Sequence, residues 1–272
     1  MDSRPVGVFD SGMGGLTVLH ECLVTMPHED FVYLGDAARL PYGPRPLPEL
    51  RRFAHEIGGW LEGQGVKLIV AACNSATSAA LPQLQERLAV PIVGVLTPEA
   101  HAAVQATRNR KVGLLATEAT VAAGRYEQLV HTLDAGVRLT SVACPALVPL
   151  IESDDPFAQE TVDAVREYAA PLKQAGVDTV ILGCTHYPLI RQIFQRVLGR
   201  EVTLVFSAEE TAREVAETLA RKGIENDGAR EGAYRFVTTG DPAQFRALGA
   251  RFLQLPIADV ECVTIAELEA AA

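Results

Sequence analysis

The sequence predicts an α/β protein with two similar lobes, each built on a mostly parallel sheet that helices flank. Two observations lead to this prediction. Apolar runs of strand length alternate with helix-length segments along the chain, which is the rhythm of parallel sheets covered by helices. A pattern of glycine, apolar strand and cysteine also occurs twice, once in each half of the chain. We expect a pseudo-twofold relation between the lobes, with a ligand site between them.

The first lobe is predicted from the alternation in the first hundred residues. Strands are expected at 6–10, 31–35, 66–72 and 91–95, and helices at 16–26, 49–64 and 75–88. Gly65 follows the second of these helices, as glycine commonly does at a helix C-terminus.

The second lobe is predicted from a repeat. Segment 111–117 resembles 5–11, and segment 176–185 resembles 65–74. In each copy of the second pair a glycine lies eight residues before a cysteine, Cys73 or Cys184, and an apolar strand fills the gap. Chance similarity between apolar strands is the competing explanation, but the matched order makes it the weaker one.

The end of the chain is predicted to return to the first lobe. From about residue 205 we expect a helix at 208–222, a strand at 234–238, a helix at 242–252 and a short strand at 259–263. None of these strands ends in a cysteine like those at 73 and 184. The predicted domains are therefore 1–96 plus 207–272 for a discontinuous first lobe, and 97–206 for the second.

Composition limits the class of protein. The chain has 272 residues, about 1.8 typical domains of roughly 150. Its 48% apolar and 21% charged residues exclude a disordered chain, and no run approaches the ~18 apolar residues of a membrane span. Residues 1–5 lack a signal-peptide pattern, so we expect a cytoplasmic protein with no membrane partner. The net charge of −10 argues against a nucleic-acid partner.

Polar residues follow four of the predicted strands, where ligands bind in open parallel sheets. They are Asp10 and Ser11; Cys73, Asn74 and Ser75; Thr117; and Cys184, Thr185 and His186. The glycines at 12, 14 and 15 match neither a P-loop nor the G-x-G-x-x-G pattern. The alternative to a phosphate cradle there is a tight turn in which Asp10 accepts from backbone N–H groups.

The cysteines suggest acid–base chemistry. Five cysteines without a C-x-x-C pair disfavour a zinc ribbon or a thioredoxin motif, and we expect no metal site. Cys73 and Cys184 end equivalent strands, so their thiols are expected to flank one small ligand, with helix N-termini lowering their pKa. A disulfide is the competing use, which the cytoplasm disfavours. Cys22, Cys144 and Cys262 are expected to pack in the structure, with a place near the site left open for Cys144.

Two thiols on opposite sides of a small molecule suit a stereoinversion, in which one removes a proton and the other returns it. Strong electrostatic help is then required, because the Cα–H of an amino acid is a very weak acid. Pyridoxal phosphate would need a Schiff-base lysine. The chain has four lysines, none of them at a predicted strand end, so we expect chemistry without a cofactor.

Four segments resemble the glutamate racemase family of the aspartate/glutamate racemase superfamily. They are DSGMGGL at 10–16, PYG at 41–43, ACNSAT at 72–77 and GCTHYP at 183–188, with Ser75 where the family commonly has threonine. The resemblance implies cofactor-independent interconversion of L- and D-glutamate, which supplies D-glutamate for peptidoglycan and so for cell-wall biogenesis and cell shape. It also implies a homodimer.

The resemblance also implies roles for individual residues. Cys73 and Cys184 would be the two acid/bases, with Asp10 assisting Cys73, and with Glu152 and His186 assisting Cys184. The implied substrate-binding residues are Asp10, Ser11, Tyr42, Gly43, Asn74, Ser75, Thr185 and His186. Thr117 mirrors Ser11 in the repeat and is expected to contact the substrate as well.

Other functions stay open on the sequence alone. An aspartate or other amino-acid racemase would use the same thiols. A cysteine-nucleophile amidase or hydrolase would use one thiol with His186 nearby. A two-lobed amino-acid-binding protein would bind without turnover. Structural alternatives also remain for single residues: His186 as a core histidine, Glu152 as a solvated carboxylate, and Tyr42 and Gly43 as parts of a turn.

Overall fold

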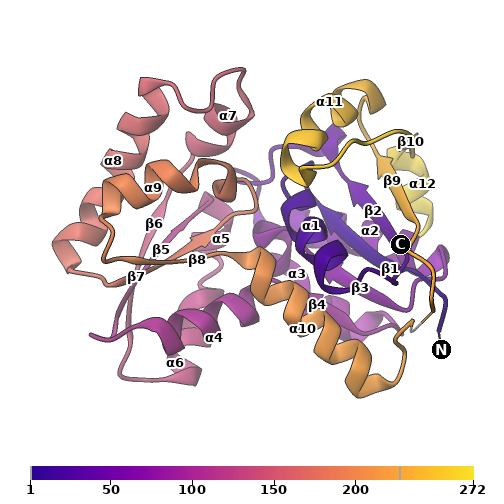
Figure 1. The fold of residues 1–272 in the computed structure, drawn as a ribbon, viewed down its shortest axis with the longest axis horizontal. Helices are drawn as coiled ribbons and strands as arrows, with labels where there is room; N and C mark the ends of the chain where they lie inside the picture. Colours follow the sequence, from indigo (N-terminus) through magenta and orange to yellow (C-terminus); the bar gives the residue numbers. More distant parts are fainter. Residues whose placement is uncertain (1, 227) are drawn as a thin grey trace.

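The computed structural model describes residues 2–226 and 228–272 and contains two parallel sheets. One sheet has six strands in the order β10-β9-β2-β1-β3-β4, and the other has four in the order β6-β5-β7-β8. Figure 1 shows the second sheet and its helices on the left and the first sheet on the right, beside both termini. Residues 1 and 227, which the sequence assigns to the first lobe, lie outside the described residues.

The strands bear out the predicted alternation. The first sheet contains β1 (Val6–Asp10), β2 (Phe31–Gly35), β3 (Leu68–Ala71), β4 (Ile92–Gly94), β9 (Tyr234–Thr238) and β10 (Glu261–Cys262). The second contains β5 (Lys111–Ala116), β6 (Arg138–Ala143), β7 (Thr179–Gly183) and β8 (Thr203–Val205). All neighbouring strands pair in parallel.

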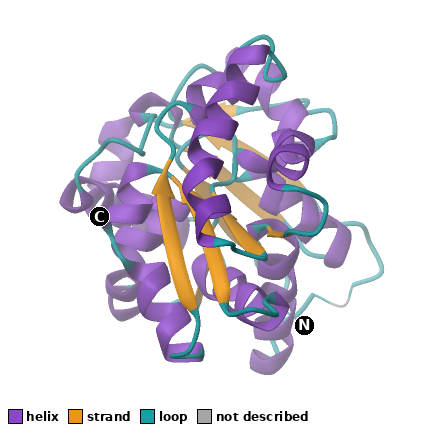
Figure 2. Cartoon of the chain, turned by 90° about the vertical axis from the view of Figure 1, so that its left-hand side faces the viewer, coloured by secondary structure: helices purple, strands orange, loops and turns teal. Residues whose placement is uncertain are grey.

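Helices lie on both sides of the sheets, as the turned view shows (Figure 2). The α-helices are α1 (Leu16–Thr25), α2 (Leu47–Gly63), α3 (Asn74–Arg87), α4 (Leu96–Ala106), α5 (Glu118–Ala122), α6 (Arg125–Leu133), α7 (Leu147–Glu152), α8 (Gln159–Ala175), α9 (Arg191–Leu198), α10 (Ser207–Lys222), α11 (Pro242–Leu253) and α12 (Ile265–Ala270). Two 3₁₀ turns complete them, η1 (Ala37–Arg39) and η2 (Tyr187–Ile190). No helix of residues 2–226 and 228–272 is long and apolar enough to cross a membrane.

The two sheets share a strand order. The order β2-β1-β3-β4 corresponds to β6-β5-β7-β8, so β1 and β3 occupy the same places as β5 and β7. Gly65 and Gly176 both have a left-handed backbone, with φ of +75° and +68°, which glycine adopts at no steric cost. The predicted repeat and the two-lobed α/β class are thus confirmed, and β9 beside β2 returns the end of the chain to the first sheet. The exact domain boundaries stay a prediction.

Some predicted elements differ at their ends. Helix α2 begins at Leu47 instead of residue 49, because Pro46 is an extended N-cap and proline is tolerated in the first turn. The strand expected at 259–263 is reduced to Glu261–Cys262, the two residues that pair with β9.

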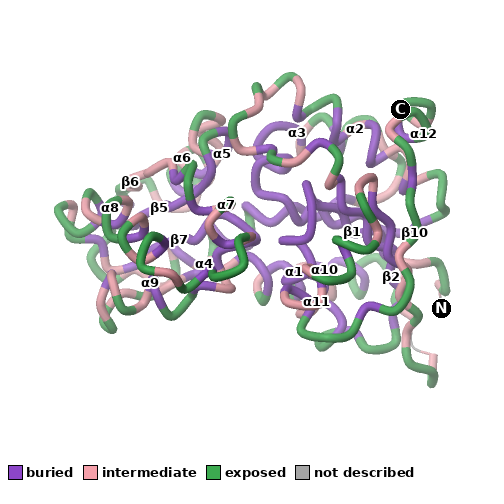
Figure 3. Tube along the Cα trace, turned by 90° about the horizontal axis from the view of Figure 1, so that it is seen from above, coloured by how far each residue is buried: buried purple, intermediate pink, exposed green. Residues whose placement is uncertain are grey.

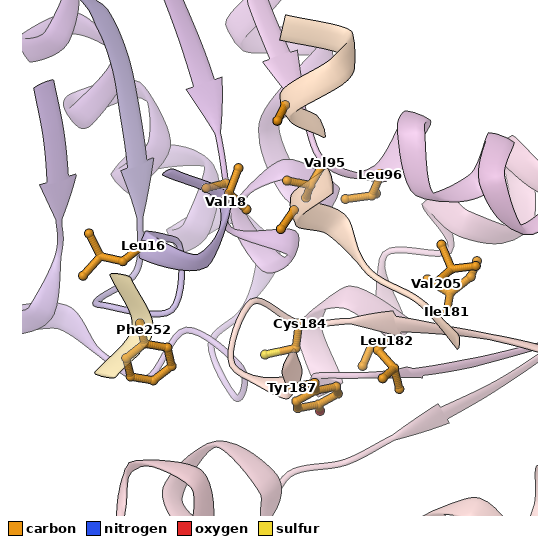
Figure 4. Packing of buried hydrophobic residues seen from close by; sticks show 14 of the residues in the cluster. Leu16, Val18, Val95, Leu96, Ile181, Leu182, Cys184, Tyr187, Val205 and Phe252 are labelled. Atoms are coloured by element: carbon orange, nitrogen blue, oxygen red, sulfur yellow. The ribbon is translucent and has the colours of Figure 1, made fainter. Parts of the chain in front are cut away.

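One apolar core extends through both lobes. A single cluster of buried side chains includes residues from the first lobe, such as Leu16, and residues from the second, such as Leu182. Figure 4 shows that Phe252 of α11 and Cys184 belong to this same packed region. The trace seen from above is buried along the strands and exposed along outer helices and loops (Figure 3). The lobes therefore share a continuous interior rather than touching only at their rims.

The glycine-rich turn after β1 packs tightly against the second lobe. A Cβ atom on Gly14 would lie 2.4 Å from Thr185 Oγ1 and 2.5 Å from His186 Nδ1, both in the second lobe. A Cβ on Gly15 would lie 2.5 Å from Asp10 Cβ. Gly14 thus leaves room for the second lobe and Gly15 for the side chain of Asp10, which accounts for the motif without a phosphate.

We predict that Gly14→Ala destabilises the protein by about 1–3 kcal/mol, the usual cost of overpacking. Its backbone is not in the left-handed region, so only the space beside Thr185 and His186 opposes the added methyl group. Urea unfolding measures the free energy. Gly63→Ala, at the end of α2 with nothing within 4 Å, is the control and is expected to be neutral or stabilising. Equal effects of the two substitutions would contradict the proposed close contact.

Candidate active site

A cavity of about 250 Å³ lies where the strand ends of the two lobes meet. This volume lies just below the ~300–1,000 Å³ of pockets for drug-sized ligands, which suits a small metabolite. Ten of the twelve predicted site residues line it: Ser11, Tyr42, Gly43, Cys73, Asn74, Ser75, Thr117, Cys184, Thr185 and His186. The predicted residues Asp10 and Glu152 stand behind this lining, each bonded to a residue that belongs to it.

Cys73 ends β3 and caps the N-terminus of α3, where its sulfur accepts a hydrogen bond from Ala76 N at 3.5 Å. The sequence predicted that this position lowers the pKa of the thiol. That prediction is wrong here, because burial and the charge of Asp10 raise the pKa of Cys73 to about 12. Cys73 is therefore held as a protonated thiol.

Asp10 is fully buried at the end of β1 and connects the lobes. Its Oδ2 accepts from Gly12 N at 3.0 Å, and its Oδ1 accepts from Thr185 Oγ1 at 3.3 Å. The first bond is the tight-turn arrangement that the sequence left open. Both carboxylate oxygens of Asp10 are therefore engaged in hydrogen bonds. Its negative charge raises the pKa of Cys73, which lines the cavity.

Cys184 follows β7 and begins a chain of polar contacts. Its sulfur lies 3.8 Å from His186 Nδ1, and His186 Nε2 lies 2.9 Å from Glu152 Oε1. Burial opposes a charge on His186, but the Cys184 sulfur and the Glu152 carboxylate prevail and raise its pKa to about 10. His186 is thus an imidazolium at neutral pH, and its positive charge lies beside the Cys184 sulfur. Phe252 packs edge-on against its ring.

Hydroxyl groups from both lobes meet on another side of the cavity. Ser75 Oγ and Thr117 Oγ1 are 2.8 Å apart, and Thr120 Oγ1 accepts from Thr117 Oγ1 at 3.0 Å. Thr117 also caps α5, so it occupies a strand-end position like that of Ser11, as the repeat predicted.

The loop that carries Tyr42 and Gly43 is fixed by buried charges. Tyr42 donates its hydroxyl proton to Asp36, whose Oδ2 also accepts from Arg39 Nε at 2.6 Å. Arg39 binds Glu56 as well. Gly43 accepts from the Ala119 backbone across the lobes at 2.9 Å, and a Cβ on it would lie 3.4 Å from Thr117 Cβ. The sequence suggested a turn at Tyr42 and Gly43, but it did not predict the contact of Gly43 with the second lobe.

Behind Asn74 lies a buried carboxyl group that the sequence did not reveal. Glu99 Oε2 accepts from Asn74 Nδ2 at 3.0 Å and from the hydroxyl of Tyr126. Burial raises the pKa of Glu99 to about 8, against the opposing effect of these hydrogen bonds. Its carboxyl group is therefore mostly uncharged at neutral pH.

Several lining residues were also missed or left open. They are Leu40, Pro41, Pro44, Glu118, Cys144, Pro145, Val148, Pro149 and Gly183. Leu40 and Pro44 flank the PYG motif, which contains Pro41, and Glu118 follows Thr117, so adjacency to a predicted residue would have found them. Val148 and Pro149 lie in α7, which carries no comparable signal. Cys144 lies at the site, the position left open for it.

The residues at the cavity give little support to a lysine-bound cofactor or a metal. All five cysteines are free thiols. No cluster of metal-ligating side chains occurs among the described residues. The lining contains neither lysine nor arginine in the part of the chain described. Lys67, for example, is buried elsewhere against Glu29, at 2.6 Å.

The fold and the site together define a class: two-lobed α/β proteins in which each lobe contributes a thiol to one shared cavity. The sequence model of the Asp/Glu/Hydantoin racemase family matches residues 18–215, and the chain belongs to this family. A glutamate racemase of Parafrankia sp. is 48% identical over 254 residues, which cover 93% of this chain and 92% of the relative.

Solved structures of relatives agree with this assignment. A glutamate racemase isoform of Bacillus anthracis superimposes with a TM-score of 0.94 at 39% identity, covering 97% of this chain and 99% of its own. The glutamate racemase of Francisella tularensis, solved in complex with D-glutamate, gives 0.91 at 31% identity, covering 97% and 98%.

The raised pKa of Glu99 predicts a pH dependence of stability. Between pH 4.5 and about 8 the folded protein keeps a proton that the unfolded chain releases. The free energy of unfolding of the wild type should therefore fall with rising pH relative to Glu99→Gln, with a slope approaching about 1.4 kcal/mol per pH unit. Denaturant unfolding at several pH values measures it. Glu86→Gln, at an exposed position of α3, is the control, and curves for Glu99→Gln parallel to the wild type would contradict the prediction.

Proposed function

We propose that this chain is a glutamate racemase, an isomerase that interconverts L- and D-glutamate without a cofactor. The observation that carries the proposal is the pair Cys73 and Cys184, which end equivalent strands of the two lobes and line one cavity. The glutamate racemase relatives and their structures support glutamate as the substrate. The proposed role is the supply of D-glutamate for peptidoglycan, by a cytoplasmic homodimer.

In the proposed reaction one sulfur removes the Cα proton as a thiolate and the other donates a proton to the opposite face of the planar carbanion. The Cα–H bond breaks on one side and a new one forms on the other, so the thiolate and the thiol exchange places. The reverse reaction uses the same two groups with their roles exchanged. Turnover of the opposite enantiomer, or proton exchange with water, restores the starting state.

The surroundings of the two sulfurs differ. Burial and the charge of Asp10 raise the pKa of Cys73 to about 12, whereas the imidazolium of His186 lies beside the Cys184 sulfur at 3.8 Å. Cys73 is then the proposed acid for the first proton transfer, and Cys184 takes the role of the base. The raised pKa of Cys73 also makes its thiolate a stronger base, which suits the weakly acidic Cα–H in the reverse direction.

Neutral groups are proposed to hold the two carboxylates of glutamate. The lining offers the hydroxyl groups of Ser11, Ser75, Thr117 and Thr185. The N-terminus of α3, a helix of 14 residues, opens at the cavity and presents the positive end of its dipole. A site of fixed dipoles can bind an anion even though the protein carries a net charge of −10.

A second candidate function follows from the Cys184, His186 and Glu152 contacts. A thiol, an imidazole and a carboxylate in this order also describe a cysteine nucleophile with its base and orienting group. A hydrolase or amidase of this kind would not need Cys73. An amino-acid-binding protein would show affinity without turnover, and a racemase of broader range would act on aspartate at a rate comparable to glutamate.

Incubation of L-glutamate in D₂O without added cofactor tests the proposal. We expect D-glutamate with deuterium at Cα while the remaining L-glutamate still carries hydrogen early in the reaction. Cys73→Ser and Cys184→Ser should each lower the rate at least ~100-fold, because each removes an acid/base group. Cys262→Ser, at an exposed thiol, is the control. Absence of exchange in the wild type rejects the racemase, and full activity of either active-site variant rejects the two-thiol mechanism.

Glu152→Gln is expected to shift the alkaline side of the pH–rate profile. Glu152 helps to raise the pKa of His186, so its neutral replacement lowers that pKa from about 10. The fall of kcat/KM at high pH, where Cys184 loses its cationic neighbour, should then begin about one pH unit lower. Asp154→Asn, an exposed carboxylate in the same loop, is the control. An unshifted alkaline side for Glu152→Gln would show that Glu152 does not act through His186.

A further inference from the structure

The side-chain amide of Asn74 is fixed by two residues of the opposite lobe. Asn74 begins α3 in the first lobe, whereas Glu99 lies in α4 and Tyr126 in α6, both packed with the second sheet. Asn74 Nδ2 donates to Glu99 Oε2 at 3.0 Å and to the Tyr126 hydroxyl oxygen at 2.9 Å. The amide nitrogen of Asn74 is therefore directed at a pair of oxygen atoms from the opposite lobe.

The chemistry of these partners decides which way the amide faces. Tyr126 donates its hydroxyl proton to Glu99 Oε2, so its oxygen can only accept from Asn74, and the reverse orientation of the amide would place Oδ1 against that oxygen. The observed orientation leaves Asn74 Oδ1 buried, without a hydrogen-bond partner among the described residues. A buried acceptor without a donor costs about 1–3 kcal/mol.

Asn74 also lines the cavity, so a ligand can supply the missing donor. Glutamate offers its ammonium group as a donor at neutral pH, and its two carboxylates only accept. A ligand ammonium that bonds to Oδ1 removes the cost of the unpartnered oxygen. An amide in the reverse orientation would instead present N–H groups and repel it.

We propose that Glu99 is a positioning residue of the reaction, which holds the Asn74 amide so that its oxygen accepts from the substrate ammonium group. Tyr126 acts with it, since its hydroxyl bonds to both residues. The inference rests on the proposed function, because it requires an amino acid in the cavity. A purely structural role as a link between the lobes is the alternative, and losing such a link would lower kcat and the free energy of unfolding along with the affinity.

A double-mutant cycle between Glu99 and Asn74 separates these roles. Glu99→Leu should raise KM for glutamate at least tenfold with a smaller change in kcat, because the amide then loses its preferred orientation. Glu99→Gln should retain most of the affinity, since its amide oxygen still accepts from Asn74. In the Asn74→Ala background, Glu99→Leu should change KM less than twofold.

Two outcomes would overturn the proposal: an unchanged KM in Glu99→Leu, or the same fold-increase with and without the Asn74 side chain. Should Glu99→Leu fail to fold, Tyr126→Phe takes its place in the cycle, with an expected increase of KM of threefold or more. Thr161→Val, which removes a buried hydroxyl of α8 without a partner among the described residues, is the control for an apolar replacement in the second lobe.

Calorimetric titration with L-glutamate makes this test independent of turnover. The dissociation constants should follow the same pattern as KM across the variants. A wild type that binds glutamate without racemising it would refute the proposed function. The double-mutant cycle measured with dissociation constants would still decide the role of Glu99. A wild type that racemises glutamate, with additive effects of the two substitutions, would refute only the role of Glu99.

Discussion

The site depends on one contact, the packing of the segment after β7 against the glycine-rich turn after β1. Thr185 donates to the fully buried Asp10 at 3.3 Å, and its carbonyl oxygen accepts from Thr17 at 3.2 Å. A buried carboxylate without donors would be costly, so this bond and that from Gly12 make Asp10 tolerable there. The contact places Cys184 at the cavity that Cys73 also lines. It also holds the Asp10 carboxylate, whose charge raises the pKa of Cys73.

A repeated fold has here produced two unlike halves of one site. The strand order and the glycine that precedes each cysteine strand are the same in both lobes. The neighbours differ, because Cys73 has a carboxylate beside it and Cys184 an imidazole. The repeated fold thus fixes where the two thiols lie, and the residues packed beside each thiol give it a different electrostatic environment.

Much of this could be predicted from the sequence, because the features concerned are local. The alternation of strands and helices and the residues at strand ends follow from patterns within ten or so residues. The ionisation of Cys73 could not be predicted, because burial and Asp10 oppose the effect of the helix N-terminus. Nor could the place of Glu99, which meets Asn74 only through tertiary packing of α3 with α4 and α6. Asp10 also stands behind the lining, but it ends strand β1 and so carries a local signal, whereas Glu99 lies inside helix α4 without one.

Apart from the His186 imidazolium, no cationic side chain of the described residues lines the cavity, so most of the polar groups that face it are uncharged. Arg39 lies close to the loop of Tyr42, but Asp36 and Glu56 hold its guanidinium group, and it stacks on Phe53 at 4.0 Å. Its charge therefore fixes the loop instead of binding a carboxylate. A mobile lysine or arginine in the cavity would attract anions of many shapes, whereas fixed hydroxyls and amides bind only groups that match their positions. The cavity thus gains selectivity from geometry, and the buried charges around it supply the rigidity that this selectivity requires.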